Sequence, residues 1–318
     1  MKKILVNDGM SSEGINILEE KKFFVETKHV PQDKLIQEIN SNQFEALVVR
    51  SATKVDKAII DGCENLKMII RGGVGMDNID VEYAEKKGIL VFNTPSSSST
   101  AVAELVFAHL ASMTRFLHLS NRLMPLEGEV KFKDLKKSFS NGTELKNKTL
   151  GIIGFGRIGQ ELARIGIGVG MNIIAHDLNI KKTKIELKFF NGQTKEFEIK
   201  TTNLKEVLSQ SDFISVHVPK LSKKAIIGTK EIQMMKKNAF IINTARGGVI
   251  DENALMLALE KGTISCAALD VYENEPNPSI HLMMQHNISL SPHIGAATIE
   301  AQKRIGIEVA NLIIAHLK

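Results

Sequence analysis

Residues 150–159 read Leu150-Gly151-Ile152-Ile153-Gly154-Phe155-Gly156-Arg157-Ile158-Gly159. An apolar run stops at a Gly-x-Gly-x-x-Gly turn, and a helical pattern begins directly after it. In such a turn Gly154 permits the tight bend, Gly156 lets the backbone approach a phosphate, and Gly159 lets the helix pack closely on the strand. The amino end of the helix offers free N–H groups to an anion. The alternative is a strand-to-helix turn that binds no ligand, and features elsewhere in the sequence distinguish the two interpretations.

The composition is that of a globular protein with room for two domains. The chain has 318 residues, 43% hydrophobic and 24% charged, with a net charge of +5. It has no Trp and only two Tyr, so it lacks aromatic platforms for stacking bases, and we expect no nucleic-acid partner. The start of the chain does not resemble a signal peptide, and no apolar run approaches the ~18 residues of a membrane span. We therefore expect a cytoplasmic protein without a membrane partner, acting on a small anionic molecule, with Cys63 and Cys266 as buried free thiols.

The first ninety residues alternate short apolar runs with helical patterns, which predicts a parallel sheet covered by helices on both faces. The expected strands are 4–6, 23–25, 46–49, 68–70 and 89–92, and the expected helices are 11–20, 31–40, 55–61 and 80–87. A serine-rich turn at 93–100 then leads into an apolar helix from Ala101 to about Leu119, and we interpret this turn as a crossing between domains. Residues 121–148 are lysine-rich and weakly periodic, which indicates a solvated arm.

The same alternation restarts at Thr149. The expected strands are 149–153, 172–176, 213–217, 239–243, 266–270 and 287–290, and the expected helices are 157–169, 203–209, 230–236, 251–261 and 298–316. Between Asp177 and Asn203 two alternating segments flank Asn191-Gly192, which predicts a β-hairpin over 185–199. The last helix follows the last strand and could return to the first domain. We therefore favour a second domain inserted into the first.

An acidic residue ends the strand that follows the glycine turn. Asp177 lies 23 positions after Gly154, near the spacing expected for a group that accepts hydrogen bonds from the adenosine ribose. A carboxylate there would repel a 2′-phosphate, and the next residues supply no arginine to neutralise one. We infer a dinucleotide site with NAD as the cofactor rather than NADP.

Three later stretches place polar side chains where strands end. They contain Arg246 in Asn243-Thr-Ala-Arg-Gly-Gly248, Glu275 in Tyr272-Glu-Asn-Glu-Pro276, and His293 in Ser291-Pro-His-Ile-Gly295. In an open α/β sheet, ligands bind outside the carboxyl ends of the strands, so these side chains should converge beside a nicotinamide.

With these stretches and the glycine turn, the chain resembles the D-isomer-specific 2-hydroxyacid dehydrogenases from nearly end to end. The resemblance implies two doubly wound parallel-sheet α/β domains: a flavodoxin-like substrate domain (1–97 and 292–318) and a Rossmann cofactor domain (98–291) inserted into it. It also implies a homodimer, or a tetramer, formed through the cofactor domains, with the arm at about 121–148 as the dimerisation element. The same resemblance makes Arg246, Glu275 and His293 the catalytic residues.

The chemistry of these three side chains fits that role. Arg246 can bind a substrate carboxylate in a forked pair, and His293 can take the hydroxyl proton as hydride leaves. Glu275 would orient the imidazole and stabilise the positive charge it acquires. Each residue taken alone also has an ordinary structural explanation.

The resemblance also assigns contacts with the cofactor beyond the glycines and Asp177. These fall on Val74, Arg157, Ile158, Val218, Thr244, Ala245, Arg246, Asp270, His293, Gly295 and Ala296. The remaining histidines show no metal-ligand spacing, and we expect no metal site.

The substrate is predicted from the first domain. Arg50 and Arg71 could form a cationic wall for a phosphate, and the glycine-rich turn with Gly73, Val74 and Gly75 leaves backbone N–H groups for a carboxylate. Both segments resemble those of D-3-phosphoglycerate dehydrogenases. We therefore expect oxidation of D-3-phosphoglycerate to 3-phosphohydroxypyruvate, a step of serine biosynthesis, by a short form without regulatory domains.

Two alternatives stay open. One is a broad D-2-hydroxyacid dehydrogenase or 2-ketoacid reductase acting on glyoxylate or hydroxypyruvate. The other is an NAD-sensing binding protein that shares the fold. Two features depart from the resemblance: the chain has no tryptophan near Val130, and the hairpin at 185–199 is not part of the common core.

Overall fold

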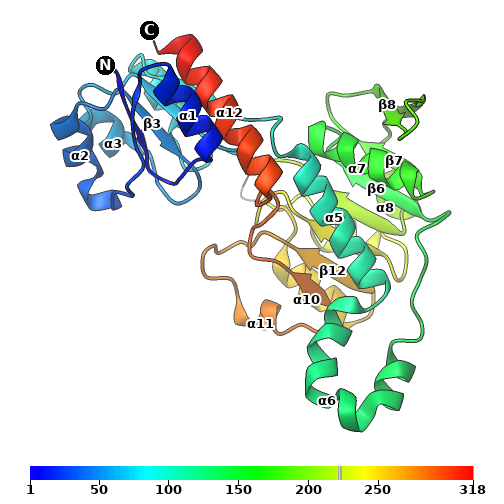
Figure 1. The fold of residues 1–318 in the computed structure, drawn as a ribbon. Helices are drawn as coiled ribbons and strands as arrows, with labels where there is room; N and C mark the ends of the chain where they lie inside the picture. Colours follow the sequence, from blue (N-terminus) through cyan, green and yellow to red (C-terminus); the bar gives the residue numbers. More distant parts are fainter. Residues whose placement is uncertain (221, 223, 318) are drawn as a thin grey trace. The chain divides into compact units, whose positions relative to one another are not determined.

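The chain folds into two compact units, each built around its own parallel sheet. The computed structural model describes residues 1–220, 222 and 224–317 (Figure 1). One unit comprises Met1–Ala101 and Ala296–Lys318, and the other comprises Val102–Gly295. The boundaries expected from the sequence, 97/98 and 291/292, fall four residues before these. The α/β class with parallel sheets is confirmed.

The first unit holds a five-stranded sheet in the order β2-β1-β3-β4-β5, all parallel. Its strands are β1 (Lys3–Val6), β2 (Phe24–Glu26), β3 (Ala46–Val49), β4 (Met68–Arg71) and β5 (Leu90–Asn93). Between them run α1 (Ser12–Glu20), the short 3-10 turn η1 (Gln32–Lys34), α2 (Leu35–Asn42), α3 (Lys57–Gly62) and α4 (Val81–Lys86). This is the flavodoxin-like strand order, and its switch point lies between β1 and β3.

The last helix of the chain, α12 (Ile299–His316), completes the first unit by packing against α1 and one face of this sheet (Figure 1). Two glycines let the two helices approach. A Cβ atom on Gly14 would lie 2.4 Å from the carbonyl oxygen of Gly306, and one on Gly306 would lie 2.3 Å from Ser11 Oγ. A helix from the far end of the sequence therefore covers the first sheet, as its position after the last strand had indicated.

The second unit holds a six-stranded parallel sheet in the order β13-β12-β11-β10-β6-β7. Its strands are β6 (Thr149–Ile153), β7 (Asn172–His176), β10 (Phe213–Val216), β11 (Phe240–Asn243), β12 (Cys266–Leu269) and β13 (Ile288–Leu290). Its helices include α7 (Arg157–Gly168), α8 (Leu204–Gln210), α9 (Thr229–Gln233), α10 (Glu252–Glu260) and α11 (Ile280–Met283). The order reverses between β6 and β10, which makes the loops after these two strands the expected place for a ligand.

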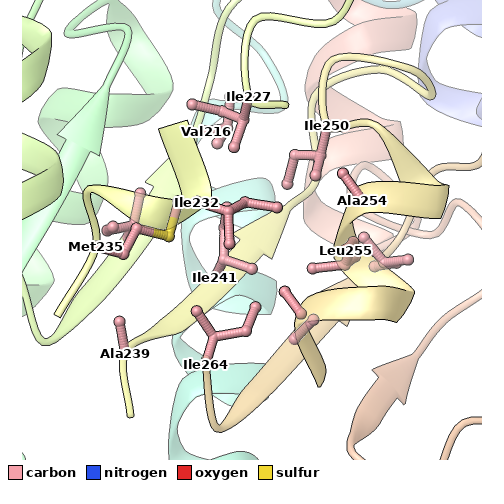
Figure 2. Close-up of a cluster of buried hydrophobic side chains, with 14 of the residues drawn as sticks. Val216, Ile227, Ile232, Met235, Ala239, Ile241, Ile250, Ala254, Leu255 and Ile264 are labelled. Atoms are coloured by element: carbon pink, nitrogen blue, oxygen red, sulfur yellow. The ribbon is translucent and has the colours of Figure 1, made fainter. Parts of the chain in front are cut away.

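Figure 2 shows the apolar core on one side of this second sheet. Val216 and Ile241 come from adjacent strands, and Ile232 and Leu255 come from α9 and α10, which cover them. All four side chains are at most 2% exposed. Burial of this kind holds the central strands in place, so the loops that leave their carboxyl ends start from fixed positions.

The hairpin predicted at Asn191-Gly192 is confirmed. β8 (Lys182–Lys188) and β9 (Thr194–Lys200) pair antiparallel as a separate two-stranded sheet. Gly192 has a positive φ of 82°, as a tight hairpin turn requires. Directly after the hairpin, Thr201 forms an isolated parallel bridge with Ala175 of β7.

The expectation of one apolar helix from Ala101 to about Leu119 followed by an irregular arm is wrong. α5 (Ser99–Thr114) ends early, and α6 (Leu117–Ser138), which is kinked at Lys131, makes most of the expected arm helical. Phe116 separates the two helices with a left-handed φ of 55°, a conformation unusual for a bulky residue. Neither a glycine nor a proline marks this break, so the local sequence gave no sign of it.

Cys63 and Cys266 are free and buried, as predicted. None of the helices within residues 1–220, 222 and 224–317 carries an apolar stretch of membrane-spanning length.

Candidate active site

The glycine turn lies at the switch point of the second sheet, and its three glycines meet different demands. Gly154 has a φ of 93°, and a Cβ atom there would lie 2.7 Å from the carbonyl oxygen of His217, in the loop after β10. A Cβ atom on Gly159 would lie 2.4 Å from the carbonyl oxygen of Gly154. A Cβ atom on Gly156 would meet nothing within 4 Å, so that side of the turn is open. Gly156 is also the N-cap of α7 and has no side chain to cap the first N–H groups, which leaves them for an anion.

Asp177 follows β7 and is hydrogen-bonded to the glycine turn. Its Oδ2 accepts from the backbone N–H of Phe155 at 2.7 Å, and its Oδ1 accepts from those of Asn179 and Ile180 at 2.8 and 3.0 Å. Partial desolvation raises the pKa of Asp177, but these backbone bonds outweigh it, so the pKa stays below its usual value. The carboxylate is therefore ionised at neutral pH. Three of its roughly four acceptor positions are occupied, which leaves one for an outside donor.

Thr244 supplies a buried polar atom in the loop after β11. Its side chain is 8% exposed, and its hydroxyl has no hydrogen-bond partner within the described part of the chain. A buried hydroxyl of this kind normally bonds to something, which fits a polar ligand at this edge of the sheet. Val218, in the loop after β10, packs against the glycine turn, since its Cγ1 would lie 2.8 Å from a Cβ atom on Gly154. Together with the open side of Gly156, these features fit a bound dinucleotide.

Arg246 lies in the same loop as Thr244, held next to the segment that carries Glu275. Asn243 fixes the loop by accepting from the N–H of Ala245 and donating to the carbonyl of Arg246. A Cβ atom on Gly247 would lie 1.8 Å from the carbonyl oxygen of Tyr272, so the two backbones touch. Only glycine fits there, and this contact brings the loops after β11 and β12 together.

Glu275 and His293 form a direct pair. Glu275 Oε2 lies 2.7 Å from His293 Nδ1, and Glu275 Oε1 accepts from the backbone N–H of Tyr272 at 2.9 Å. A carboxylate that accepts at Nδ1 makes that nitrogen the protonated one, so Nε2 is left to accept a proton. His293 is 42% exposed and Glu275 35%, so the pair can be reached by a substrate.

Asp270 holds the loop that carries His293. Asp270 is 1% exposed, and its two oxygens accept from the backbone N–H groups of Ile294 and Gly295 at 2.8 and 2.9 Å. His293 itself has a left-handed φ of 54°. The resemblance implies only a cofactor contact for Asp270. Its bonds to the His293 loop join residues 24 and 25 positions apart, and no local sequence pattern predicts them.

The residues expected to bind the substrate lie in the first unit, at the carboxyl ends of β3 and β4. The backbone N–H of Arg50 donates to Asp8 Oδ2 at 2.7 Å, and its carbonyl accepts from Asn78 Nδ2 at 2.8 Å. Gly73 has a φ of 150°, and a Cβ atom on it would lie 1.6 Å from Arg71 Nη1, so the guanidinium group lies over this glycine.

The rest of this glycine-rich turn is tied to β5. The carbonyls of Gly73 and Val74 accept from the backbone of Thr94 and the side chain of Asn93. Gly75 follows on the same turn. Val74 and Ala296 belong to the first unit, and the other expected cofactor contacts belong to the second.

The chain is similar in sequence to a family of known dehydrogenases and to individual members of it. Residues 108–295 match the family model for the NAD-binding domain of D-isomer specific 2-hydroxyacid dehydrogenases. The chain is 40% identical over 321 residues to a hydroxypyruvate reductase of Thermotoga maritima, covering 99% of this chain and 98% of that relative. It is 42% identical over 314 residues to a D-3-phosphoglycerate dehydrogenase of Methanocaldococcus jannaschii, covering 98% of this chain but only 57% of that relative.

A solved structure of a related enzyme has the same fold. The chain superposes on a glyoxylate reductase of Paecilomyes thermophila with a TM-score of 0.82 and 30% identity, covering all of this chain and 95% of the other. The matched domain and the relatives make the protein an oxidoreductase with a nicotinamide cofactor. The open glycine turn, the paired Glu275 and His293, and these similarities lead to one conclusion: the chain belongs to the D-isomer-specific 2-hydroxyacid dehydrogenase family.

Proposed function

We propose that this protein oxidises D-3-phosphoglycerate to 3-phosphohydroxypyruvate with NAD, the oxidative step that opens serine biosynthesis. The observation that carries the dehydrogenase chemistry is the 2.7 Å pair of Glu275 and His293 next to the Arg246 loop. The preference for a phosphorylated acid rests on Arg71 over Gly73, with Arg50 on the neighbouring strand end.

In the proposed reaction each of the three side chains has one task. Arg246 binds the substrate carboxylate through its planar fork and polarises the C2 oxygen. His293 Nε2 accepts the hydroxyl proton as the hydride leaves C2. Glu275 holds Nδ1–H and stabilises the imidazolium that forms. When bound, NAD supplies the acceptor for the hydride.

Asp177 supports NAD rather than NADP as the cofactor, and we expect its charge to set this preference. Asp177→Asn removes the charge and should lower the ratio of kcat/KM with NAD to that with NADP by about 10–100-fold, because a carboxylate repels a 2′-phosphate strongly at short range. Initial rates with both cofactors measure the ratio. Asp212→Asn is the matched control. Asp212 also accepts a hydrogen bond from a backbone N–H, that of Thr149, but it lies at the amino ends of β6 and β10, away from the glycine turn. An unchanged ratio in Asp177→Asn would refute the assignment.

The substrate preference is tested by turnover on paired acids with and without phosphate. We expect D-3-phosphoglycerate to exceed D-glycerate in kcat/KM, and Arg71→Gln to lower the first by about 10–100-fold and the second by less than about threefold, the usual range for charge-assisted bonds. Lys54→Gln, an exposed cation near Arg50, is the control and should change neither value.

Other outcomes of this screen point to the alternatives. Equal activity on both acids, with efficient reduction of glyoxylate or hydroxypyruvate, would favour the broad 2-ketoacid reductase, which the Thermotoga and Paecilomyes relatives also support. Binding of NAD without turnover of any acid would favour a sensing protein.

We also propose that the protein acts as a homodimer joined through α6, where the sequence placed the arm. Large apolar side chains stay exposed along this helix: Leu126 at 79%, Val130 at 87% and Phe132 at 57%. Exposed apolar surface of this kind is typical of protein interfaces. Light scattering should give twice the chain mass of 35.1 kDa, and a tetramer is the other assembly to look for. A monomer would contradict the proposal.

A further inference from the structure

A buried histidine on α5 belongs to a chain of hydrogen bonds that the proposed chemistry does not use. His109 is 6% exposed, and both of its ring nitrogens are bonded: Nδ1 lies 2.9 Å from Ser289 Oγ, and Nε2 lies 2.9 Å from Ser291 Oγ. Its neighbours on the same helix, Val106, Leu110 and Met113, are fully buried apolar residues. A polar ring in such surroundings is costly unless it is fully bonded, so these two bonds hold it in one orientation.

The chain continues from His109 to the loop of His293. Ser291 Oγ donates to Asp270 Oδ1 at 2.6 Å. The same Asp270 oxygen accepts from the backbone N–H of Ile294, and the other accepts from Gly295. Three steps therefore lead from α5 through Ser291 and Asp270 to the two residues that follow His293. All these residues belong to the second unit.

The direction of these bonds fixes the tautomer of His109. Ser291 gives its only proton to Asp270, so its oxygen must accept from His109, which places the imidazole proton on Nε2. Nδ1 then accepts from the hydroxyl of Ser289. Burial lowers the pKa of His109, against an opposing effect of the Asp270 charge, so the ring is neutral as this pattern requires. Each donor in the chain has one acceptor.

We propose that His109 is a positioning residue that, through Ser291, sets the orientation of the Asp270 carboxylate and thereby the conformation of the loop bearing His293. The proposal rests on the catalytic role proposed for His293. That loop needs such support because His293 has a left-handed φ, and Asp270 is the acceptor for both N–H groups after it. Without the Nε2 donor, the Ser291 oxygen loses one of its two bonds, and its bond to Asp270, one of three that hold the carboxylate, is less constrained.

The decisive pair of variants is His109→Leu and His109→Gln. Leucine fills the space without a donor, whereas the glutamine amide can place an N–H near the position of Nε2. His109→Leu should lower kcat about tenfold with KM for NADH changed less than about threefold, and His109→Gln should recover to within about threefold of the parent. Rates are measured with NADH and hydroxypyruvate, and also with NAD and D-3-phosphoglycerate. His281→Leu, at an exposed histidine on α11 outside the chain of bonds, is the control and should change neither constant.

Hydrogen–deuterium exchange gives a readout that does not depend on the substrate. The amides of Ile294 and Gly295 should exchange about tenfold faster in His109→Leu and at parental rates in His109→Gln. Ser291→Ala should reproduce the effect of the leucine variant. Ser289→Ala removes one of the two bonds of the ring but keeps the bond between Nε2 and Ser291, so it should raise exchange less than Ser291→Ala does.

Different outcomes bear on the positioning role of His109 and on the catalytic role of His293. Parental kcat and parental exchange in both His109→Leu and Ser291→Ala would overturn the positioning role, as would equal effects of Ser289→Ala and Ser291→Ala. Faster exchange in the leucine variant, together with full turnover in a His293 variant, would support the chain of bonds but refute the catalytic role of His293.

Discussion

Replacement of His293 by Asn is expected to lower kcat by about 10²–10⁴-fold, the usual contribution of a positioned general acid or base. The amide cannot accept the proton that Nε2 accepts. Asn tolerates the left-handed φ of 54° at this position better than Ala does, so the loop should keep its conformation. The affinity for NADH, measured by the change in cofactor fluorescence on binding, should stay within about threefold of the parent. Steady-state kinetics and this titration together separate chemistry from binding.

Two further variants test whether the loss of kcat in His293→Asn comes from the proposed acid–base role. Glu275→Gln keeps an acceptor for His293 Nδ1 but removes the charge, so we expect a smaller loss of about 10–100-fold. His281→Asn changes an exposed histidine on α11 of the same unit and should leave kcat unchanged. Turnover close to the parental rate in His293→Asn would remove this residue from the mechanism.

Replacement of Arg246 by Lys is expected to lower kcat/KM for the organic acid by about 10–100-fold. Lysine keeps the positive charge but cannot form two parallel bonds to a carboxylate, and charge-assisted bonds are worth about 1.5–3 kcal/mol each. NADH binding should fall by a smaller factor, because Arg246, although also expected to contact the cofactor, is proposed to form its paired bonds with the substrate. Kinetics at saturating cofactor measure the effect.

A chemical rescue tests whether the fork itself is needed. Guanidinium ion added to Arg246→Ala should restore part of the lost rate, whereas ammonium should restore less. Arg164→Lys is the control, since Arg164 pairs with Glu161 on α7 and donates to the carbonyl of Glu186. If the two lysine variants lose activity equally, the effect of Arg246 does not come from substrate binding.

The sequence predicted most of the second sheet to within one or two residues, and the reason is physical. Its strands are short, all but β7 are largely buried, five of the six contain β-branched residues, and each is bounded by a polar or glycine-containing loop. The hairpin was equally predictable, because Asn191-Gly192 is a local turn signal that does not depend on distant contacts. The break at Phe116 was not predictable, since a left-handed phenylalanine is held by its surroundings and not by its own preference.

The sequence by itself determined the class of fold and the side chains proposed to carry out the chemistry. Parallel strands bring their carboxyl ends to one edge, so Arg246, Glu275 and His293 could be assigned to a single site from their positions after strands. Only the tertiary structure decided how these groups are held: the contact of Gly247 with Tyr272, the bonds of Asp270 to the His293 loop, and the orientation of His109. These depend on close approach between residues far apart in the chain, such as His109 and Ser291, 182 positions apart, and no local pattern records such a pairing.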